Sequence, residues 1–306
     1  MRVMNNKPVL VVGSAALDTV ESPAGKVDDA LGGSSFYFST AASLLSAVRL
    51  VAVVGTDFPM EKIEFLNSRN VDMEGLDIAD GKTFRWGGKY HKDPNIRDTL
   101  FTELGVFETF NPDIPEHFRN TPLVFLGNIH PSLQENVLDQ MIDPELVVLD
   151  TMNFWIEGTP DELDRVISRV NVLIVNDEEA MQLTGRTDII TAAEALLERG
   201  LSKVVIKKGQ HGAALFGEGG KMFFLPAFPV KNVKDPTGAG DTFAGGFMGY
   251  LASHDLEDFS AWRMAMVYGS IIASFVVQDF SMNGTKTLIL QDIEDRINKL
   301  KELVSF

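Results

Sequence analysis

The chain has 306 residues, 45% of them hydrophobic, which is enough for one large domain with a sizeable core. Its net charge of −16 disfavours nucleic acid and anionic membranes as partners, because an acidic surface repels phosphate groups. The lack of cysteine excludes a disulfide scaffold, a thiolate nucleophile and cysteine-ligated zinc. We find neither a signal peptide pattern nor an apolar run of about 18 residues, so we expect a cytoplasmic location.

Short apolar runs alternate with longer helical patterns along the chain. The runs are rich in Val, Ile and Leu on both faces, as in parallel strands covered on both sides. The predicted strands are residues 8–13, 49–55, 123–127, 145–150, 171–175 and 203–207. The predicted helices include residues 34–47, 131–141, 161–170, 191–199, 241–253, 256–277 and 290–304. This order predicts an α/β fold: one three-layer, doubly wound domain over residues 1–306, with a mostly parallel sheet.

Two segments, at about 14–33 and 82–109, do not follow this pattern. Residues 82–90 and 98–108 read as antiparallel strands joined by a polar loop at 93–95 (Asp-Pro-Asn). We expect these segments to form a small β-sheet lid, because lids that exclude water are common over enzyme active sites. An ordinary surface hairpin is the alternative.

The sharpest motif is DPTGAGDTF at residues 235–243, which opens a predicted helix. The first N–H groups of a helix lack internal partners, so Gly238, Ala239 and Gly240 offer an anion hole for a phosphoryl group. Asp241 stands beside these donors, where the helix dipole favours its ionised form and it can accept a hydroxyl proton. The alternative is a glycine-rich turn in which Asp241 only caps the helix.

This motif resembles the C-terminal signature of the ribokinase-like family, the phosphofructokinase B type of carbohydrate kinases. Further similar motifs occur in the order and spacing of that family, at residues 11–18, 32–33, 54–57, 176–179 and 207–212. The resemblance implies an ATP-dependent kinase that transfers the γ-phosphate to a hydroxymethyl group of a sugar or sugar derivative. Asp241 would be its base and the 238–241 backbone its anion hole. It also implies ATP and Mg²⁺ as cofactors.

The resemblance assigns roles to further residues. Those implied to hold the substrate are Asp18, Gly32, Gly33 and Asn128, and those implied for the nucleotide are Asn176, Glu179, Lys208, Gly209, Asn283 and Gly284. Mg²⁺ would be bound through the ATP phosphates, with Glu179 acting through water, and K⁺ is a further expectation, with Asp235 contributing. From the residues alone, Asn176 with Glu179 also reads as a capping box, Lys208 as a solvated strand end and Asp18 as a surface carboxylate.

One departure from the family concerns the acceptor. The asparagine that usually follows the Gly-Gly pair is missing from residues 33–39 (GSSFYFS), which favours a more apolar pocket unless Phe36 and Phe38 are core residues. A nucleoside kinase is therefore the alternative, with residues 36–38 and Trp86 holding the base. A non-catalytic small-molecule-binding protein is a third hypothesis. Exposed aromatic residues in the lid would be consistent with a homodimer formed through it.

Overall fold

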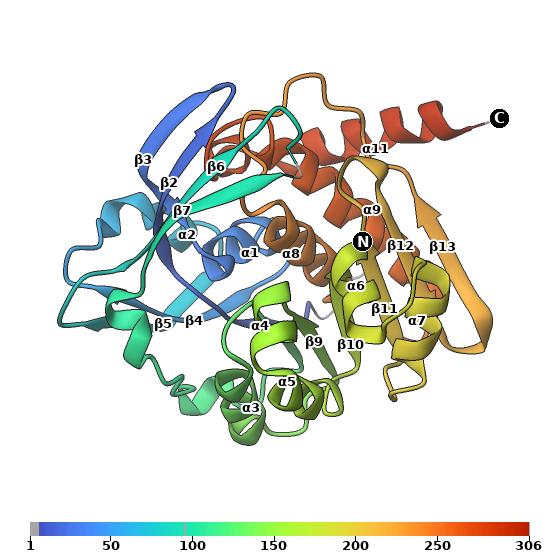
Figure 1. Ribbon diagram of the computed structural model, residues 1–306, viewed down its shortest axis with the longest axis horizontal. Helices are drawn as coiled ribbons and strands as arrows, with labels where there is room; N and C mark the ends of the chain where they lie inside the picture. Colours follow the sequence, from blue (N-terminus) through green and yellow to red (C-terminus); the bar gives the residue numbers. More distant parts are fainter. Residues whose placement is uncertain (1–5, 95, 306) are drawn as a thin grey trace.

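Two β-sheets organise the chain in the computed structural model, which describes residues 6–94 and 96–305 (Figure 1). The larger sheet has the strand order β13-β12-β11-β10-β9-β8-β1-β4-β5. All neighbours from β11 through β5 are parallel, whereas β12 and β13 are antiparallel additions at one edge. Its strands are β1 (Val9–Val12), β4 (Val48–Gly55), β5 (Val71–Ala79), β8 (Leu123–Leu126), β9 (Leu146–Asp150), β10 (Val172–Asn176), β11 (Lys203–Lys207), β12 (Ala213–Gly217) and β13 (Lys221–Leu225).

Helices cover both faces of this sheet (Figure 1). On one face lie α1 (Ser34–Ala42), α8 (Ala239–Leu251), α9 (Phe259–Val276) and α11 (Leu290–Val304). On the other lie α3 (Pro131–Gln140), α5 (Pro160–Ile167), α6 (Asp177–Thr184) and α7 (Ile189–Leu197). Short helices complete the set: α2 (Glu64–Asn67), α4 (Asn153–Gly158) and α10 (Asn283–Lys286). The predicted three-layer, doubly wound α/β fold is confirmed.

The central strands divide their side chains between two hydrophobic cores. In β1, Val9 and Val11 belong to the core under α1 and α8, whereas Leu10 and Val12 belong to the core under α3 and α5. This alternation follows from the two-residue period of a strand, and it explains why the sequence is apolar at every position there. The edge strand β5 was not predicted, since its sequence VDMEGLDIA mixes polar and apolar residues and most of it is partly or fully exposed.

The second sheet has four strands in the order β3-β2-β6-β7 (upper left in Figure 1). They are β2 (Ala16–Ser22), β3 (Gly25–Gly32), β6 (Phe84–Tyr90) and β7 (Arg97–Glu103), and they lie within the two segments from which we predicted a lid. Every residue of β7, at the edge of this sheet, is exposed. The predicted strand over 98–108 stops at residue 103 and continues as a 3₁₀ turn, and Asn95 of the predicted loop is outside the described residues.

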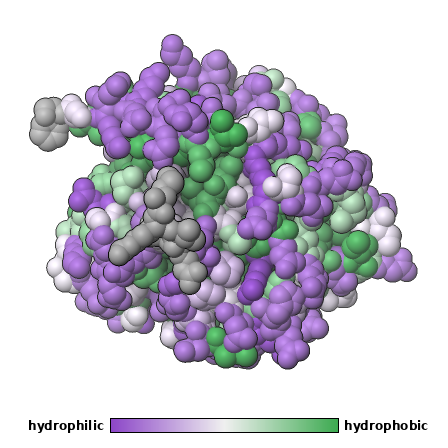
Figure 2. All heavy atoms as spheres, turned by 180° about the vertical axis from the view of Figure 1, so that it is seen from behind, coloured by the Kyte–Doolittle hydropathy of each residue, from purple (hydrophilic) through white to green (hydrophobic). Residues whose placement is uncertain are grey.

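Within the described residues, α9 alone is long and apolar enough to span a membrane by length and composition, and 56% of it is buried. It packs closely on α8: a Cβ atom on Gly246 would stand 3.0 Å from the Cα of Gly269. Those contacts are the ones expected of a core helix, and the face of the molecule in Figure 2 is mostly hydrophilic.

Candidate active site

Several polar side chains stand at the carboxyl edge of the parallel sheet. Asp150, Asn176 and Lys207 are the last residues of β9, β10 and β11, and these strands are neighbours in the sheet. Because parallel strands end at the same edge, residues from distant parts of the sequence meet there. Open α/β sheets bind their ligands at this edge.

The first turn of α8 is bare of large side chains. Gly238 precedes it in the left-handed conformation, with φ 71°, and its carbonyl accepts a hydrogen bond of 2.8 Å from the N–H of Thr242. A Cβ atom on Gly238 would stand 2.3 Å from Cγ of Tyr37, and one on Gly240 would stand 3.0 Å from Nζ of Lys207. The helix start therefore lies between an aromatic ring and an ammonium group, and the close approach of the ring requires glycine at position 238.

Asp241 lies in this first turn and is half-buried. Desolvation raises its pKa to about 7, and Asp150 adds to the rise, whereas Lys207 and Arg97 lower it. We had expected the helix start to favour the ionised form; here burial outweighs it. A carboxylate whose pKa lies near neutral pH is well suited to accept a proton.

A buried ion pair stands next to Asp241. Nζ of Lys207 lies 3.2 Å from Oδ1 of Asp150, with side-chain exposures of 21% and 10%. Burial lowers the pKa of Lys207, but the carboxylates of Asp150, Glu179 and Asp241 raise it above its ordinary value. Sequence reasoning missed this pair: from the motif at 207–212 it selected Lys208 and Gly209 rather than Lys207, and Asp150 belongs to none of the motifs.

Asn176 and Glu179 form a capping box at the start of α6. The Asn176 side chain accepts from the Glu179 N–H at 2.7 Å, and Oε2 of Glu179 accepts from the Asn176 N–H at 2.8 Å. Burial raises the pKa of Glu179 to about 7. In residues 6–94 and 96–305 no group of three or more His, Cys, Asp or Glu side chains could hold a metal. A Mg²⁺ ion bound mainly by phosphate oxygens, with one nearby carboxylate, fits these residues.

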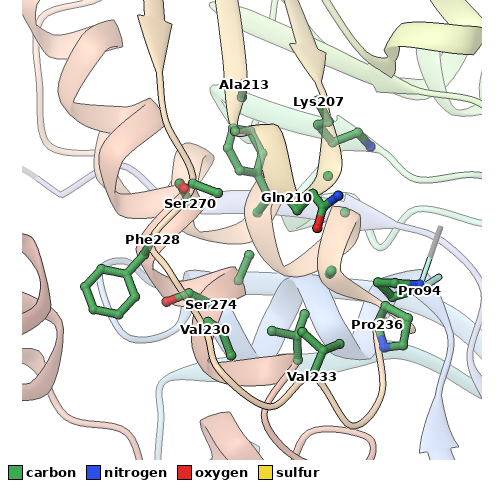
Figure 3. A pocket seen from close by; sticks show the side chains of 18 of the residues that line it. Pro94, Lys207, Gln210, Ala213, Phe228, Val230, Val233, Pro236, Ser270 and Ser274 are labelled. Carbon is green, nitrogen blue, oxygen red and sulfur yellow. The ribbon is translucent and has the colours of Figure 1, made fainter. Parts of the chain in front are cut away.

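A cavity of about 470 Å³ opens beside the start of α8 (Figure 3). Its polar end holds Lys207, Gly209 and Gly240, and its walls include Phe228, Val233 and Val277. A pocket of this size, apolar with few polar groups, is typical of small-molecule sites.

The structure separates three predicted nucleotide residues from this cavity. Nζ of Lys208 lies 5.8 Å from the centre of the Phe224 ring, and it is Lys207, not Lys208, that lines the cavity. Asn283 and Gly284 start α10, outside the lining, and Gly284 packs so closely on α9 that a Cβ would stand 2.2 Å from the Phe275 carbonyl oxygen. Lys208, Asn283 and Gly284 therefore lie outside the lining of this cavity, and their nucleotide contacts stay a prediction.

The predicted substrate residues Asp18, Gly32 and Gly33 meet where the small sheet joins the large one. A Cβ atom on Gly32 would stand 2.0 Å from Oδ2 of Asp18, and the N–H of Gly33 donates to the same carboxylate. Burial and, to a smaller extent, the neighbouring carboxylates of Asp235 and Asp241 raise the pKa of Asp18 to about 8. These predicted residues are thus close enough to Asp241 to affect one another's charge.

Tyr37 stands in this group; the sequence named it only within the run 36–38, as a candidate contact to a base. Its side chain is buried, and burial, with Asp235, Asp18 and Tyr90 nearby, raises its pKa well above the ordinary value. The hydroxyl of Tyr90, from the small sheet, lies 3.1 Å from Oγ1 of Thr237 in the signature. Tyr37 and Tyr90 therefore lie in the same group as Asp18 and Asp235, on the side of Asp241 where the predicted substrate residues meet.

The aromatic run 36–38 does not form a stacking surface. Phe36 and Phe38 are fully buried core residues whose rings stack on Phe58 and Phe125. Trp86 is half-buried, and its ring is covered by the guanidinium of Arg97, 5.3 Å from the ring centre. The expectation that these aromatic residues hold a base is therefore corrected: only Tyr37 of the run faces the site.

Asn128 follows β8 and comes directly after Gly127. Gly127 lies close to α1, because a Cβ atom on it would stand 3.0 Å from Oγ of Ser34. Its side-chain oxygen accepts a hydrogen bond of 2.9 Å from Nε1 of Trp155. The Trp155 ring contacts Phe154, which is 62% exposed, and His130. An aromatic group, partly exposed, thus adjoins Asn128.

Asp235 begins the signature, and 1% of its surface is exposed. Its two carboxylate oxygens accept hydrogen bonds of 2.9 and 3.0 Å from the N–H groups of Thr237 and Ser281. Asp235 therefore connects the start of the signature to the segment before α10.

A bare helix start, a carboxylate with a pKa near 7 and a buried lysine beside an apolar cavity define a phosphotransferase of the α/β class. Comparison with known proteins shows to which family it belongs. The model of the pfkB family of carbohydrate kinases matches residues 141–286. A cytidine kinase from Thermococcus kodakarensis is 33% identical over 257 residues, covering 82% of this chain and 91% of that protein.

Two further proteins are similar. A 2-dehydro-3-deoxygluconokinase from Thermoproteus tenax is 38% identical over 276 residues, covering 78% of this chain and 79% of that protein. The structure of a putative ribokinase II from E. coli with ATP and Mg²⁺ has a TM-score of 0.78 at 19% identity, covering 96% and 99% of the two chains. The chain belongs to the pfkB family and is a kinase of sugars or nucleosides, for which ATP and Mg²⁺ are expected.

Proposed function

We propose that this kinase phosphorylates the hydroxymethyl group of an uncharged sugar ring, and that the sugar ring is that of a nucleoside. The observation that carries the proposal is the acceptor side of the site. The pKa of Asp18 is raised to about 8 by burial and by the carboxylates of Asp235 and Asp241. A negatively charged acceptor would add charge at a place where burial already disfavours ionised carboxylates, whereas sugar hydroxyls form hydrogen bonds with carboxyl groups in either protonation state.

The nucleoside is favoured over a simple sugar by the aromatic group of Phe154, Trp155 and His130. It adjoins Asn128, a predicted substrate residue, and Phe154 is largely exposed, so it offers a stacking surface for a base beside Asn128. The identity of 33% with a cytidine kinase supports the same substrate class.

In the proposed reaction, Asp18 and Tyr37 orient the acceptor through its hydroxyls, with the backbone of Gly32 and Gly33 leaving room for the sugar. Asp241 takes the proton of the attacking hydroxyl. The backbone N–H groups at the start of α8 stabilise the charge on the γ-phosphoryl oxygens. Positioning and charge stabilisation supply most of the rate in phosphoryl transfer, so no further covalent step is needed.

The nucleotide lies in the cavity of Figure 3, with its phosphates toward Gly209 and Gly240 at the polar end. When bound, Mg²⁺ neutralises charge between the β- and γ-phosphates. Glu179 contributes through a water molecule, while Asn176 holds Glu179 in place by the capping box.

A coupled ADP-release assay tests this function. The panel holds cytidine, uridine, adenosine, inosine, ribose, myo-inositol, 2-dehydro-3-deoxygluconate and ribose 5-phosphate, with Asp241→Asn beside the parent. We expect a nucleoside to give the highest kcat/KM, and Asp241→Asn to lose about a hundredfold or more, as for removal of a general base. Preference for an acidic or phosphorylated sugar would refute the acceptor assignment.

Three further properties belong to the same proposal. The small sheet closes over the acceptor as a lid within a single domain, and its exposed strand β7, with Leu100 and Phe101 outward, pairs with a second copy. Asp235 contributes to a K⁺ site. The enzyme acts in the cytoplasm. Analytical ultracentrifugation of the parent and of Phe101→Lys tests the dimer, and the assay in K⁺ against tetramethylammonium buffers tests the cation.

A further inference from the structure

The ammonium group of Lys207 lies against the first turn of α8. Its ammonium lies 3.0 Å from the point where a Cβ on Gly240 would stand, and its side chain lines the cavity (Figure 3). Gly240 is one of the residues whose N–H groups face the phosphoryl group in the proposed reaction. The ammonium is therefore within contact distance of that group's expected position.

The charges around Lys207 keep it protonated. Oδ1 of Asp150 lies 3.2 Å away, and Glu179 and Asp241 also attract the ammonium. Three carboxylates thus surround one ammonium, in a chain whose net charge is −16. A triphosphate entering this group brings further negative charge, so a fixed cation is needed where the γ-phosphate arrives.

We propose that Lys207 is a catalytic residue that binds the γ-phosphoryl group of the nucleotide, and that Asp150 is the positioning residue that aims it. This inference rests on the proposed function. During transfer, the acceptor oxygen bonds to the γ-phosphorus and the bond to the β,γ-bridging oxygen breaks. That oxygen leaves on ADP with the electron pair, and the acceptor proton passes to Asp241. Lys207 stays protonated and offsets the charge that moves onto the phosphoryl oxygens.

A purely structural explanation of Lys207 is that it neutralises the buried carboxylate of Asp150. The single variant Lys207→Met cannot separate the two roles, because it leaves Asp150 buried without its partner. The double variant Lys207→Met/Asp150→Asn removes both members of the ion pair, so Asp150 is not left as a buried carboxylate without its partner. If neutralisation is the only role of Lys207, the double variant recovers the parental activity.

The experiment measures kcat and KM for the parent, Lys207→Met and the double variant, and the dissociation constants of ADP and of a non-hydrolysable ATP analogue by calorimetry. We expect kcat of the double variant to stay about a hundredfold below the parent. We also expect its affinity for the ATP analogue to fall about tenfold while that for ADP changes less than about twofold, because a lysine at the γ-position contacts only the triphosphate. Lys203→Met, at the opposite end of β11 with its Nζ 4.1 Å from the centre of the Trp262 ring, is the matched control and should behave as the parent.

Recovery of parental kcat and ATP-analogue affinity in the double variant would overturn the proposal, as would an equal loss of ADP and analogue binding. If the double variant does not fold, Lys207→Met and Asp150→Asn are compared: the proposal requires the preference for the analogue over ADP to fall about tenfold in the first, and by a smaller factor in the second, which keeps the ammonium but loses the carboxylate that aims it. The binding arm needs no acceptor. If the parent phosphorylates none of the panel, the acceptor assignment fails, while the role of Lys207 is still decided.

Discussion

The ring of Tyr37 lies directly against the backbone of Gly238, so that a Cβ atom at Gly238 would overlap Cγ, Cδ1 and Cδ2 of the ring at 2.3 to 2.4 Å. The contact joins the helix that follows the Gly-Gly pair to the helix that carries Asp241. It places the acceptor side of the site next to the start of α8. The same glycine has φ 71°, so both space and backbone conformation require it.

Gly238→Ala should therefore impair both folding and activity. We expect a loss of about 2 to 4 kcal/mol in the free energy of unfolding, from overpacking against Tyr37 and left-handed strain, and a kcat at least about tenfold lower. Thermal unfolding and the ADP-release assay measure these. Gly185→Ala is the matched control, because Gly185 has φ 67° but nothing within 4 Å of its Cβ position. Its expected loss of about 1 kcal/mol in the free energy of unfolding therefore measures the left-handed strain alone. Equal effects of the two variants would show that Tyr37 does not constrain the site.

Asp241→Asn should stabilise the fold in a pH-dependent way. The pKa of Asp241 is about 7 in the folded chain and 3.8 as an ordinary value, so the folded state favours the protonated form. The stability that this raised pKa contributes is present below pH 3.8 and is lost as the pH rises through 7. The neutral amide avoids that loss, so the variant should gain on the order of 1 to 2 kcal/mol over the parent at pH 8 and little at pH 4. Denaturant unfolding at the two pH values measures the difference; a pH-independent gain would contradict the raised pKa.

Tyr37→Phe should weaken acceptor binding. It keeps the ring against Gly238 and removes a buried hydroxyl that faces Asp18 and Asp235. Loss of one hydrogen bond to the sugar should raise KM for the acceptor about tenfold, with KM for ATP unchanged. Tyr250→Phe, whose ring stacks on His254 at the far end of α8, should leave both constants at the parental values. An unchanged acceptor KM in Tyr37→Phe would place the sugar elsewhere.

Arg97→Met should shift the pH dependence of the reaction. Arg97 begins β7 of the small sheet, and its charge lowers the pKa of Asp241 and of Glu179. Without it the pKa of Asp241 rises, so the acidic limb of kcat/KM should move to higher pH. Lys89→Met removes another cation of the same sheet, one paired with Glu21 at 3.3 Å, and should leave the limb in place. If both variants shift the profile alike, the effect is one of overall charge rather than of the position of Arg97.

The central strands were predictable to within about two residues, because strands that contact a core on each face are apolar at every position. Edge strand β5 was not predicted, since one exposed face removes that signal. Local sequence also indicated the start of α8, where two glycines and an aspartate leave few conformations other than a helix N-terminus.

The aromatic residues after the Gly-Gly pair show what local sequence cannot predict, namely which side chain of a helix faces the site. Phe36, Tyr37 and Phe38 follow one another in α1, yet two are core residues and one faces the site. Consecutive helical residues point about 100° apart, so only the packing of α1 against α8 and the sheet decides which of them meets the substrate.

The sequence by itself determined the layered fold, the helix start at residues 238–241 and the class of reaction. Each of these depends on patterns within short continuous segments of the chain. The tertiary structure alone decided that Lys207 rather than Lys208 enters the cavity, that Asp150 accompanies it across 57 positions, and that Asn283 and Gly284 lie apart from it. The physical reason is the parallel sheet, which brings together side chains from separate strand ends whatever their distance along the chain.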